Sequence, residues 1–290
     1  MREARFNKIF LIVQIATATV FLGRAWQHWF WEAPYRTLLW DENWMRPLIE
    51  GIFGTSWDIY VTTSDAKIQI FIKIISGLYL ICALAAIFIH RWKKIAIVLL
   101  TLGGFSLIFL AALYCKEKFF HLGQFLEYSL QWSSPFFLIW LYKSQEIMPK
   151  MILGMKIAVA LTFICHGLYA VGYYPRPAGF MEMTMNILPI TEAGAVRFLQ
   201  IAGVLDFVAS VLIFLPGRIG IGVVAIGYCL VWGFFTTTAR IWAHFYPEFL
   251  ENLLMQWVHE SVYRFPHFLI PLAILLWQIA LNRKDFRQTQ

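Results

Sequence analysis

The residues of this chain best placed to do chemistry are ionisable side chains inside long apolar runs. His166 lies in the run FICHGLYAVGYYPRPAGF, and Asp206 lies in AGVLDF near the middle of another apolar stretch. Because a charged side chain at the bilayer centre costs roughly 2.5–3.5 kcal/mol on insertion scales, each should face a partner or water. We expect both to be catalytic, with His166 donating a proton and Asp206 fixing the tautomer of its ring. The alternative is structural, with both residues only hydrogen-bonding neighbouring helices.

Six further residues form the predicted ligand-binding set around that pair: Arg24, His28, Glu127, Arg240, Glu260 and Arg264. Arg24 and His28 are one turn apart on one helical face, and Glu260 is spaced to form an ion pair with Arg264. All are expected at mid-depth or in the outer half of their helices. We therefore predict one polar pocket that opens toward the outer leaflet, in which Arg24 or Arg240 holds a developing oxyanion. Against this, Arg24 could extend to the membrane interface and leave no charge inside.

Other kinds of site are disfavoured by spacing. His259 and His267 are two turns, about 12 Å, apart along a helix and too far apart to share a metal ion. The sequence contains neither an HxxxH nor an HExxH pair, and its four cysteines are far apart without a CxxC pair, so no metal site is predicted. Glycine motifs for phosphate binding and the GxSxG motif are also absent. The net charge of +7 is scattered over short loops, which argues against a nucleic-acid partner.

The elements that would position these residues are membrane-spanning helices. Of the 290 residues, 60% are hydrophobic and only 14% are charged, which is typical of a membrane protein. The first 23 residues imitate a signal peptide, but their apolar run continues into a Trp-rich segment, so we expect it to stay as the first span. Apolar windows of about 20 residues, enough to cross about 30 Å of hydrocarbon, predict eight transmembrane helices near residues 8–30, 67–89, 94–115, 122–142, 151–174, 196–216, 219–242 and 256–281.

Basic residues concentrate at one end of these predicted spans. The turns near Arg91 and Lys150 are basic, as is the segment after Leu281, and acidic residues gather at the other end. The positive-inside rule then places both termini in the cytoplasm. We expect a multi-pass protein of a bacterial-type inner membrane. Its partners would be the lipid bilayer and other membrane or periplasmic subunits.

The two halves of the chain are similar to each other. Three segments of the first half match segments of the second in the same order: 15–24 with 157–166, 71–91 with 198–218, and 135–139 with 266–270. We predict an all-α fold of two tandem four-helix bundles, comprising residues 1–148 and 149–290. The first bundle has a longer, Trp-rich outer loop (31–65), in which NWMRPLIEGIF predicts a short amphipathic helix. This loop either caps the outer mouth of the bundle or acts as a functional lid.

The second half resembles the DoxX/DoxD-like family of four-helix membrane proteins. The features that carry the resemblance are HGLYA at the outer end of a first helix, the Pro-containing loop YPRPAGF, and AGVLDF within a second helix. Through the internal repeat the resemblance extends to the first half, where Arg24 aligns with His166 and Tyr79 with Asp206. It implies a membrane subunit of a quinone- or thiol-linked oxidoreductase, although distant relatives resemble chaperones or cargo receptors. Only His166 and Asp206 carry over, and the lack of paired cysteines argues against disulfide exchange within the chain.

Three functions follow from these observations. The first is a redox-associated membrane subunit that binds a quinone, the predicted cofactor, in the outer polar pocket. The second is a non-catalytic assembly or chaperone subunit that docks a partner on its Trp-rich outer loop. The third is a small-molecule transporter. It ranks last because no predicted helix is interrupted at its centre by Gly or Pro, as midplane substrate sites usually require.

Overall fold

All regular secondary structure is helical in the part of the chain that the structure, a computed structural model, describes: residues 2–215 and 220–288, with side chains from Glu3 to Leu281. This confirms the all-α prediction. The ends of two predicted spans near residues 216–219 lie outside the described residues. In chain order the helices are α1 (Arg2–Phe30), α2 (Arg36–Leu39), α3 (Glu42–Phe53), α4 (Trp57–Ile87), α5 (Ile89–Trp92), α6 (Lys94–Glu117), α7 (Leu122–Leu126), α8 (Ser129–Ser144), α9 (Pro149–Val171), α10 (Ala178–Ile187), α11 (Glu192–Leu212), α12 (Ile221–Ala243), a 3₁₀ turn (Pro247–Phe249), α13 (Leu250–Gln256), α14 (Val258–Val262) and α15 (Pro266–Gln288).

Seven stretches of the described chain are long and apolar enough to cross a membrane. They are Glu3–Phe30, Trp57–Ile87, Lys94–Glu117, Pro149–Val171, Glu192–Leu212, Ile221–Ala243 and Val258–Leu281. The chain is therefore a multi-pass membrane protein.

The fourth predicted span, 122–142, is not one of these seven, because its helix is interrupted at Glu127 and Tyr128, between α7 and α8. The 16 residues of α8 rise about 24 Å, which is less than the roughly 30 Å of hydrocarbon. The last predicted span is also interrupted, between the end of α14 at Val262 and Pro266, the first residue of α15. Proline suits the first turn of a helix because it has no N–H to leave unpaired there. Both interruptions lie within about the first third of the predicted span, counted from its N-terminal end, rather than at the centre.

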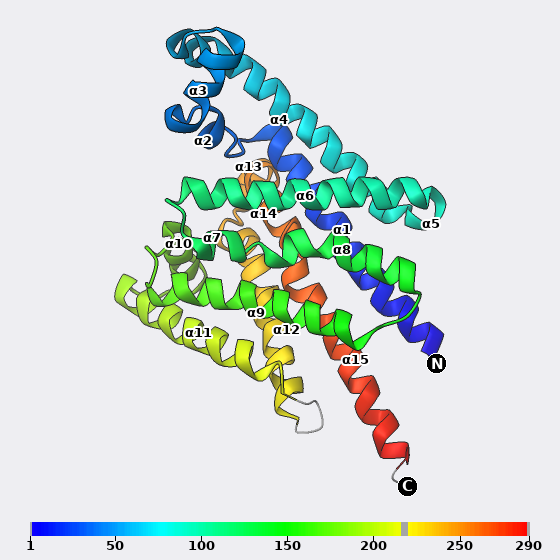
Figure 1. The fold of residues 1–290 in the computed structure, drawn as a ribbon. Helices are drawn as coiled ribbons and strands as arrows, with labels where there is room; N and C mark the ends of the chain where they lie inside the picture. Colours follow the sequence, from blue (N-terminus) through cyan, green and yellow to red (C-terminus); the bar gives the residue numbers. More distant parts are fainter. Residues whose placement is uncertain (1, 216–219, 289–290) are drawn as a thin grey trace.

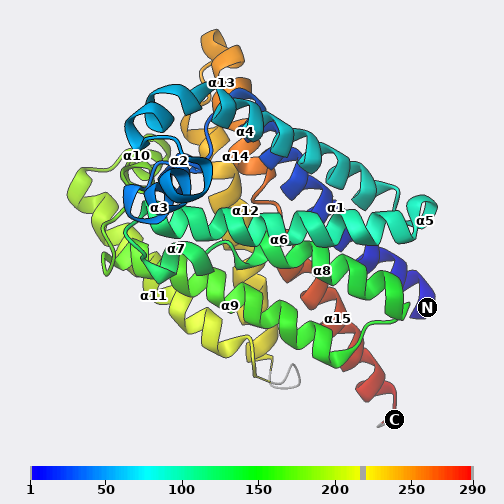
Figure 2. The same ribbon diagram turned by 45° about the horizontal axis from the view of Figure 1, so that its top comes forward.

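The long helices form two neighbouring groups, and the helices of each group pack in the same order along the chain. Helix α1 packs against α4 and α8, and α6 lies between α4 and α8; likewise α9 packs against α11 and α15, and α12 lies between α11 and α15. The two groups meet where α1 contacts α15 and where α8 contacts α9. Figures 1 and 2 both show α6, α8, α9 and α11 side by side in one layer, with α1 and α15 crossing behind it. Both chain ends lie at the same end of the bundle, opposite α10 and α2–α3 (Figure 1).

Close backbone contacts between neighbouring helices hold the polar residues of these helices in position. At the α9–α11 crossing, a Cβ added to Gly167 would lie 2.9 Å from the carbonyl oxygen of Gly203. The two glycines therefore allow α9 and α11 to touch, next to His166 on one helix and close to Asp206 on the other. A Cβ at Gly23 of α1 would lie 2.7 Å from the backbone nitrogen of Tyr263. Glycine is needed there because α1 packs directly against the interruption between α14 and α15.

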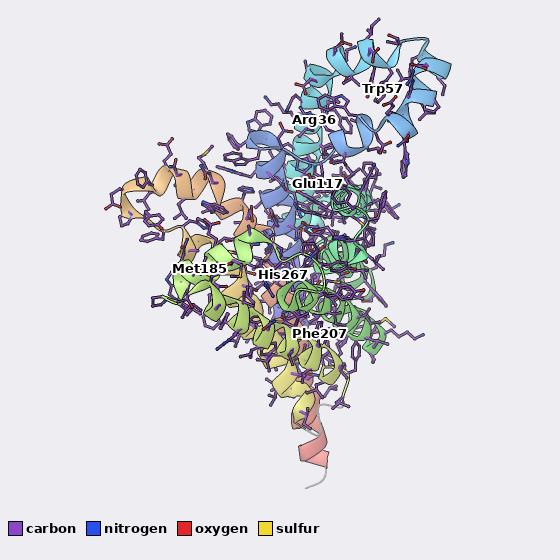
Figure 3. The ribbon with its side chains drawn as sticks, turned by 90° about the vertical axis from the view of Figure 1, so that its left-hand side faces the viewer. Arg36, Trp57, Glu117, Met185, Phe207 and His267 are labelled. Carbon is purple, nitrogen blue, oxygen red and sulfur yellow. The ribbon has the colours of Figure 1, made fainter. Side chains whose placement is uncertain are left out.

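The predicted Trp-rich outer loop is largely helical. The short amphipathic helix predicted there is confirmed as α3, which begins after Asp41, whose side chain accepts a hydrogen bond from the Trp44 N–H at 3.1 Å, and ends at Gly54 with φ 62°. The predicted outer loop (31–65) includes the first turns of α4, which begins at Trp57. Helix α2 packs against α6, whereas α3 and the first turns of α4 extend away from the layer of α6, α8, α9 and α11 (Figures 1 and 3).

Candidate functional site

A cavity of about 320 Å³ lies between α9, α10, α11, α12 and α15. Most of its wall is apolar, and its polar lining residues are His166, Thr184, Asp206, Thr236, Arg240, Arg264 and His267. Helix α10 supplies one wall through Phe180, Met183, Thr184 and Ile187, which share one helical face by their spacing of three and four residues. Figure 3 shows His267 near the centre of the bundle, with α10 and its Met185 beside it. The cavity is therefore amphipathic, with an apolar body and one charged end.

Two arginines and one glutamate form the charged end of the cavity. Arg240 Nε donates to Glu260 Oε2 at 2.6 Å, and Arg264 Nη1 donates to the same oxygen at 3.2 Å and to the Glu260 carbonyl at 3.0 Å. The arginine side chains are only 11% and 15% exposed. Arg240 reaches this place from α12, whereas Arg264 lies in the interruption before α15. One carboxylate oxygen thus joins two guanidinium groups from different helices.

Two histidines stack beside this charged end. The rings of His166 and His267 are 5.4 Å apart between centroids and inclined by 10°. His267 Nδ1 lies 2.8 Å from the carbonyl oxygen of Arg264. Because a carbonyl can only accept, Nδ1 carries the proton, and in a neutral ring Nε2 is then free to accept. Among the described residues the His166 side chain has no hydrogen-bond partner, so its ring nitrogens remain available inside the cavity.

Asp206 lines the same cavity, but its partner is not a histidine. The hydroxyl of Tyr228 on α12 donates to Asp206 Oδ1 at 2.9 Å, and the Asp206 residue is only 3% exposed. The described residues contain no hydrogen bond between Asp206 and His166. The geometry therefore gives Asp206 a role in joining α11 to α12, and it does not place the carboxylate where it would set the His166 tautomer.

Arg24, which was expected to face the same pocket, lies in a separate closed site, which we call the Arg24 cage. Its guanidinium donates to Gln131 Oε1 at 2.6 and 3.2 Å and to Gln27 Oε1 at 2.7 Å, and is 3.4 Å from the Tyr114 hydroxyl. It also lies 3.9 Å from the ring centroid of Tyr263 and 5.1 Å from that of Tyr128. Arg24 is 2% exposed, and no carboxylate of the described chain forms an ion pair with it. Amide and aromatic groups alone therefore surround this charge.

His28 and Glu127 also lie outside the lining of the cavity. His28 Nδ1 is 2.7 Å from the Arg24 carbonyl and its Nε2 is 3.3 Å from the Tyr35 hydroxyl. Glu127 lies half-buried at the interruption between α7 and α8 and accepts a hydrogen bond from Gln124 Nε2 at 2.6 Å. Of the eight predicted site residues, the structure thus brings His166, Asp206, Arg240 and Arg264 onto one cavity, with Glu260 joining the two arginines. It places Arg24 and His28 in the separate cage. Glu127 lies outside the cavity lining but interacts electrostatically with Arg240 and Arg264.

Several residues of the site were not in the predicted set. His267 and Arg264 share a helical face by spacing, so the pattern that selected Arg264 also contained His267. The α10 wall had a signal too, in the spacing of Phe180, Met183, Thr184 and Ile187. Tyr228 had none, because a tyrosine in an apolar helix is common and only packing shows that it meets Asp206.

No known protein family, characterised protein or solved structure matches this chain. The resemblance to the DoxX/DoxD-like family therefore stays a prediction. Any functional conclusion has to come from the geometry of the cavity.

Proposed function

We propose that this protein binds a lipid-soluble molecule in the cavity between α9, α10, α11, α12 and α15. The observation that carries the proposal is the division of the cavity into an apolar body and a charged end with unused donors. Ligand pockets are usually of this kind: mostly apolar walls with a few polar groups that fix the orientation of the ligand. The head of the ligand would lie near Arg264 and His166, and its apolar part against Phe163, Phe198 and Trp232.

The proposed architecture is two tandem four-helix units, residues 1–148 and 149–290, with eight membrane crossings and both termini in the cytoplasm of a bacterial-type cell. The same order of packing in the two groups of helices supports this arrangement. So does the interruption near the outer end of the last helix of each group. In this orientation α7–α8 forms the eighth crossing, and the cavity belongs to the outer leaflet.

A quinone is one lipid-soluble molecule that this cavity would suit, in keeping with the redox-linked role implied by the DoxX-like resemblance. The Nε and Nη2 groups of Arg264 have no acceptor among the described residues, so they are free to donate to a carbonyl oxygen of the head. His166, with its unpaired ring, is placed to hold or release a proton beside that head. A bound quinone would supply the electron chemistry, and the chain would supply the site.

Occupancy of the cavity can be tested by filling it. We would purify the protein and its Ala239→Phe variant in a non-ionic detergent, extract both with organic solvent and compare the retained molecules by mass spectrometry. Ala239 lines the cavity, whereas Ala112 on α6 is exposed, so Ala112→Phe is the matched control. A species kept by the wild type and by Ala112→Phe but lost from Ala239→Phe is expected. Equal retention by all three proteins would contradict the proposal.

The redox-linked role needs its own test. A short-tailed benzoquinone should quench tryptophan fluorescence in the wild type more strongly than in Ala239→Phe, because Trp232 and Trp242 line the cavity. Quenching that is identical in the two proteins would contradict a quinone site and leave the binding of other molecules open.

A second candidate function is docking of a partner protein. The observation that favours it is the apolar face of α3, where Trp44, Leu48, Ile52 and Phe53 are 56%, 44%, 70% and 69% exposed. A contiguous exposed apolar face of this kind is typical of an interaction site. The Leu48→Glu/Ile52→Glu double variant should lose any co-purifying subunit, and a subunit retained by it would count against this candidate. Transport remains third, since neither helix interruption lies at the centre of its span.

A further inference from the structure

We infer that the molecule bound in the cavity has an anionic head, either a carboxylate or a phosphate monoester, on a single apolar chain. This rests on the proposed function, since it specifies the ligand of the same cavity. It goes beyond it by specifying the charge of the head, and it makes a neutral head, such as that of a quinone, the competing possibility that the methyl ester represents in the test below.

The first reason is the balance of charge at the end of the cavity. Arg240 and Arg264 are both nearly buried, and both donate to the same oxygen of Glu260. One carboxylate thus faces two guanidinium groups. A buried cation without a counter-ion is costly in an apolar setting, and only one negative charge is bonded directly to these two positive charges.

The nearest other carboxylates form no second ion pair with these arginines among the described residues. Asp206 accepts a hydrogen bond from the Tyr228 hydroxyl, and Glu127 accepts one from the Gln124 amide. Glu127 interacts with Arg240 and Arg264 electrostatically, but only over a distance longer than an ion pair. A second direct ionic contact to the two arginines therefore has to come from a ligand.

The second reason is that the donors are open toward the cavity. Arg264 uses only Nη1 in hydrogen bonds, and Arg240 uses Nε and Nη1, the latter to the Thr236 carbonyl at 3.3 Å. Arg264 Nε and Nη2 and Arg240 Nη2 have no partner in the described chain. Guanidinium N–H groups in parallel pairs match the oxygens of a carboxylate or phosphate. Arg24 shows that this chain can satisfy every nitrogen of a buried guanidinium with its own groups, and at the cavity it does not.

The third reason concerns the apolar part of the ligand. Phe235 and Trp242 line the cavity and are also 45% and 64% exposed, so the cavity reaches the lipid-facing surface beside α12. A chain attached to a head at Arg264 would leave through this side into the bilayer. The volume of about 320 Å³ is at the lower end of the roughly 300–1,000 Å³ of small-ligand pockets, which suits one chain rather than two.

The test compares probes that differ only in the head. The protein in non-ionic detergent is titrated with a brominated fatty acid, its methyl ester and the brominated alkyl phosphate. Quenching of tryptophan fluorescence is recorded, and the quenching that Ala239→Phe also shows is subtracted as non-specific. We expect the carboxylate or the phosphate to bind at least about tenfold more tightly than the ester, as charge-assisted hydrogen bonds would require. Tighter binding of the fatty acid would indicate a free fatty acid as source, and tighter binding of the phosphate a lipid phosphate.

Variants locate the effect at the cavity. Arg264→Gln should abolish the preference for the charged head, whereas Arg46→Gln, on the exposed face of α3, should keep it. Equal affinity of the ester and both anionic probes for the wild type would overturn the inference and leave the proposed function standing. If all three probes quench Ala239→Phe as strongly as they quench the wild type, both the inference and the proposed function are overturned. If Arg264→Gln does not fold, the comparison of heads on the wild type decides by itself.

Discussion

Two regions of this protein place arginine inside a membrane protein in opposite ways. In the Arg24 cage, every guanidinium nitrogen has an acceptor, and three tyrosine rings lie within 5.4 Å of its carbon. At the cavity, Arg240 and Arg264 share one carboxylate oxygen and keep further N–H groups without a partner in the described chain. The two regions are nevertheless neighbours, because Tyr263, which lies over Arg24, directly precedes Arg264.

The difference separates a structural charge from one that is available to a ligand. Arg24 and Arg264 both occur in apolar sequence at similar predicted depth, so the cost of placing each of them in the membrane is of the same order. What distinguishes them is whether protein groups use up the donors. A buried cation that the chain itself surrounds acts as a fixed joint between helices, and one with donors left over is a candidate binding site.

The largest effect should come from removing the shared carboxylate. Glu260→Gln leaves two buried guanidinium groups without a counter-ion, and breaking a buried pair in this way costs about 3–5 kcal/mol. We expect a clear loss in the free energy of unfolding, measured in mixed micelles, and partial recovery when a fatty acid is added. Arg264→Gln is the matched comparison, because it leaves a balanced Arg240–Glu260 pair and should lower the free energy of unfolding by less than Glu260→Gln does. If Glu260→Gln is as stable as the wild type, the arginines have another counter-charge.

The Arg24 cage should respond to loss of its cation but not to ligand. Arg24→Met leaves the Gln131 and Gln27 side-chain oxygens without their donor, and we expect a loss of about 3 kcal/mol in the free energy of unfolding. Adding fatty acid should not restore it, in contrast to Glu260→Gln. Recovery with the ligand would mean that the cage is not closed. The exposed Arg46→Met on α3 serves as control and should be nearly neutral.

The contact between the two regions can be strained without touching either charge. In Gly23→Ala the added Cβ would lie 2.7 Å from the backbone nitrogen of Tyr263. The interruption before α15 therefore has to move. Overpacking of this kind costs about 1–3 kcal/mol, and ligand affinity should fall along with stability. Gly77→Ala on α4, where nothing lies within 4 Å of an added Cβ, should be neutral or stabilising. Unchanged affinity in Gly23→Ala would show that the two regions are independent.

The smallest effect concerns a third charged contact, outside the membrane. The hydrogen bond from Lys116, the largest influence, lowers the pKa of Asp41 below its ordinary value of 3.8. A carboxylate whose pKa is lower in the folded state than in the unfolded state stabilises the fold. This stabilisation is complete above the unfolded-state pKa and is lost as the pH falls through the folded-state pKa. Protease cleavage within α3 should therefore become faster below about pH 4 in the wild type. The Asp41→Asn variant should be cleaved at the same rate across that pH range. A pH dependence that remains in this variant would assign the effect to another group.

Sequence reasoning predicted seven of the apolar helices found in the structure, α3, and four of the polar residues that line the cavity, for identifiable reasons. Long apolar runs and amphipathic spacing are local properties, and the spacing of Glu260 and Arg264 by one turn fixes their pairing. The separation of Arg24 from Arg264 could not be predicted, because both lie in the outer part of a span and only the packing of α1 against α8 and α14 shows which way each one points. Gln131 and Tyr263, which surround Arg24, carry no charge pattern that would have indicated this role.

The fourth span illustrates the same limit. Its composition is apolar enough to predict a crossing, but the helix is interrupted at Glu127 and Tyr128, where no proline or glycine stands. Tertiary contacts are made at this interruption, among them the hydrogen bonds from the Leu130 N–H to Thr162 Oγ1 at 3.3 Å and from the Tyr169 hydroxyl to Gln124 Oε1 at 3.2 Å. A hydropathy window cannot register such contacts.

The length of α4 has a consequence for what can reach α3 from the aqueous phase. Its 31 residues rise about 46 Å, and even a tilt of about 40°, at the upper limit for membrane helices, leaves about 35 Å along the bilayer normal. That exceeds a hydrocarbon layer of about 30 Å, so one end of this helix extends past the acyl chains. If the basic turn at its C-terminal end anchors it on the inner side, the surplus length lifts α3 toward the aqueous phase, within reach of a soluble molecule that never enters the lipid.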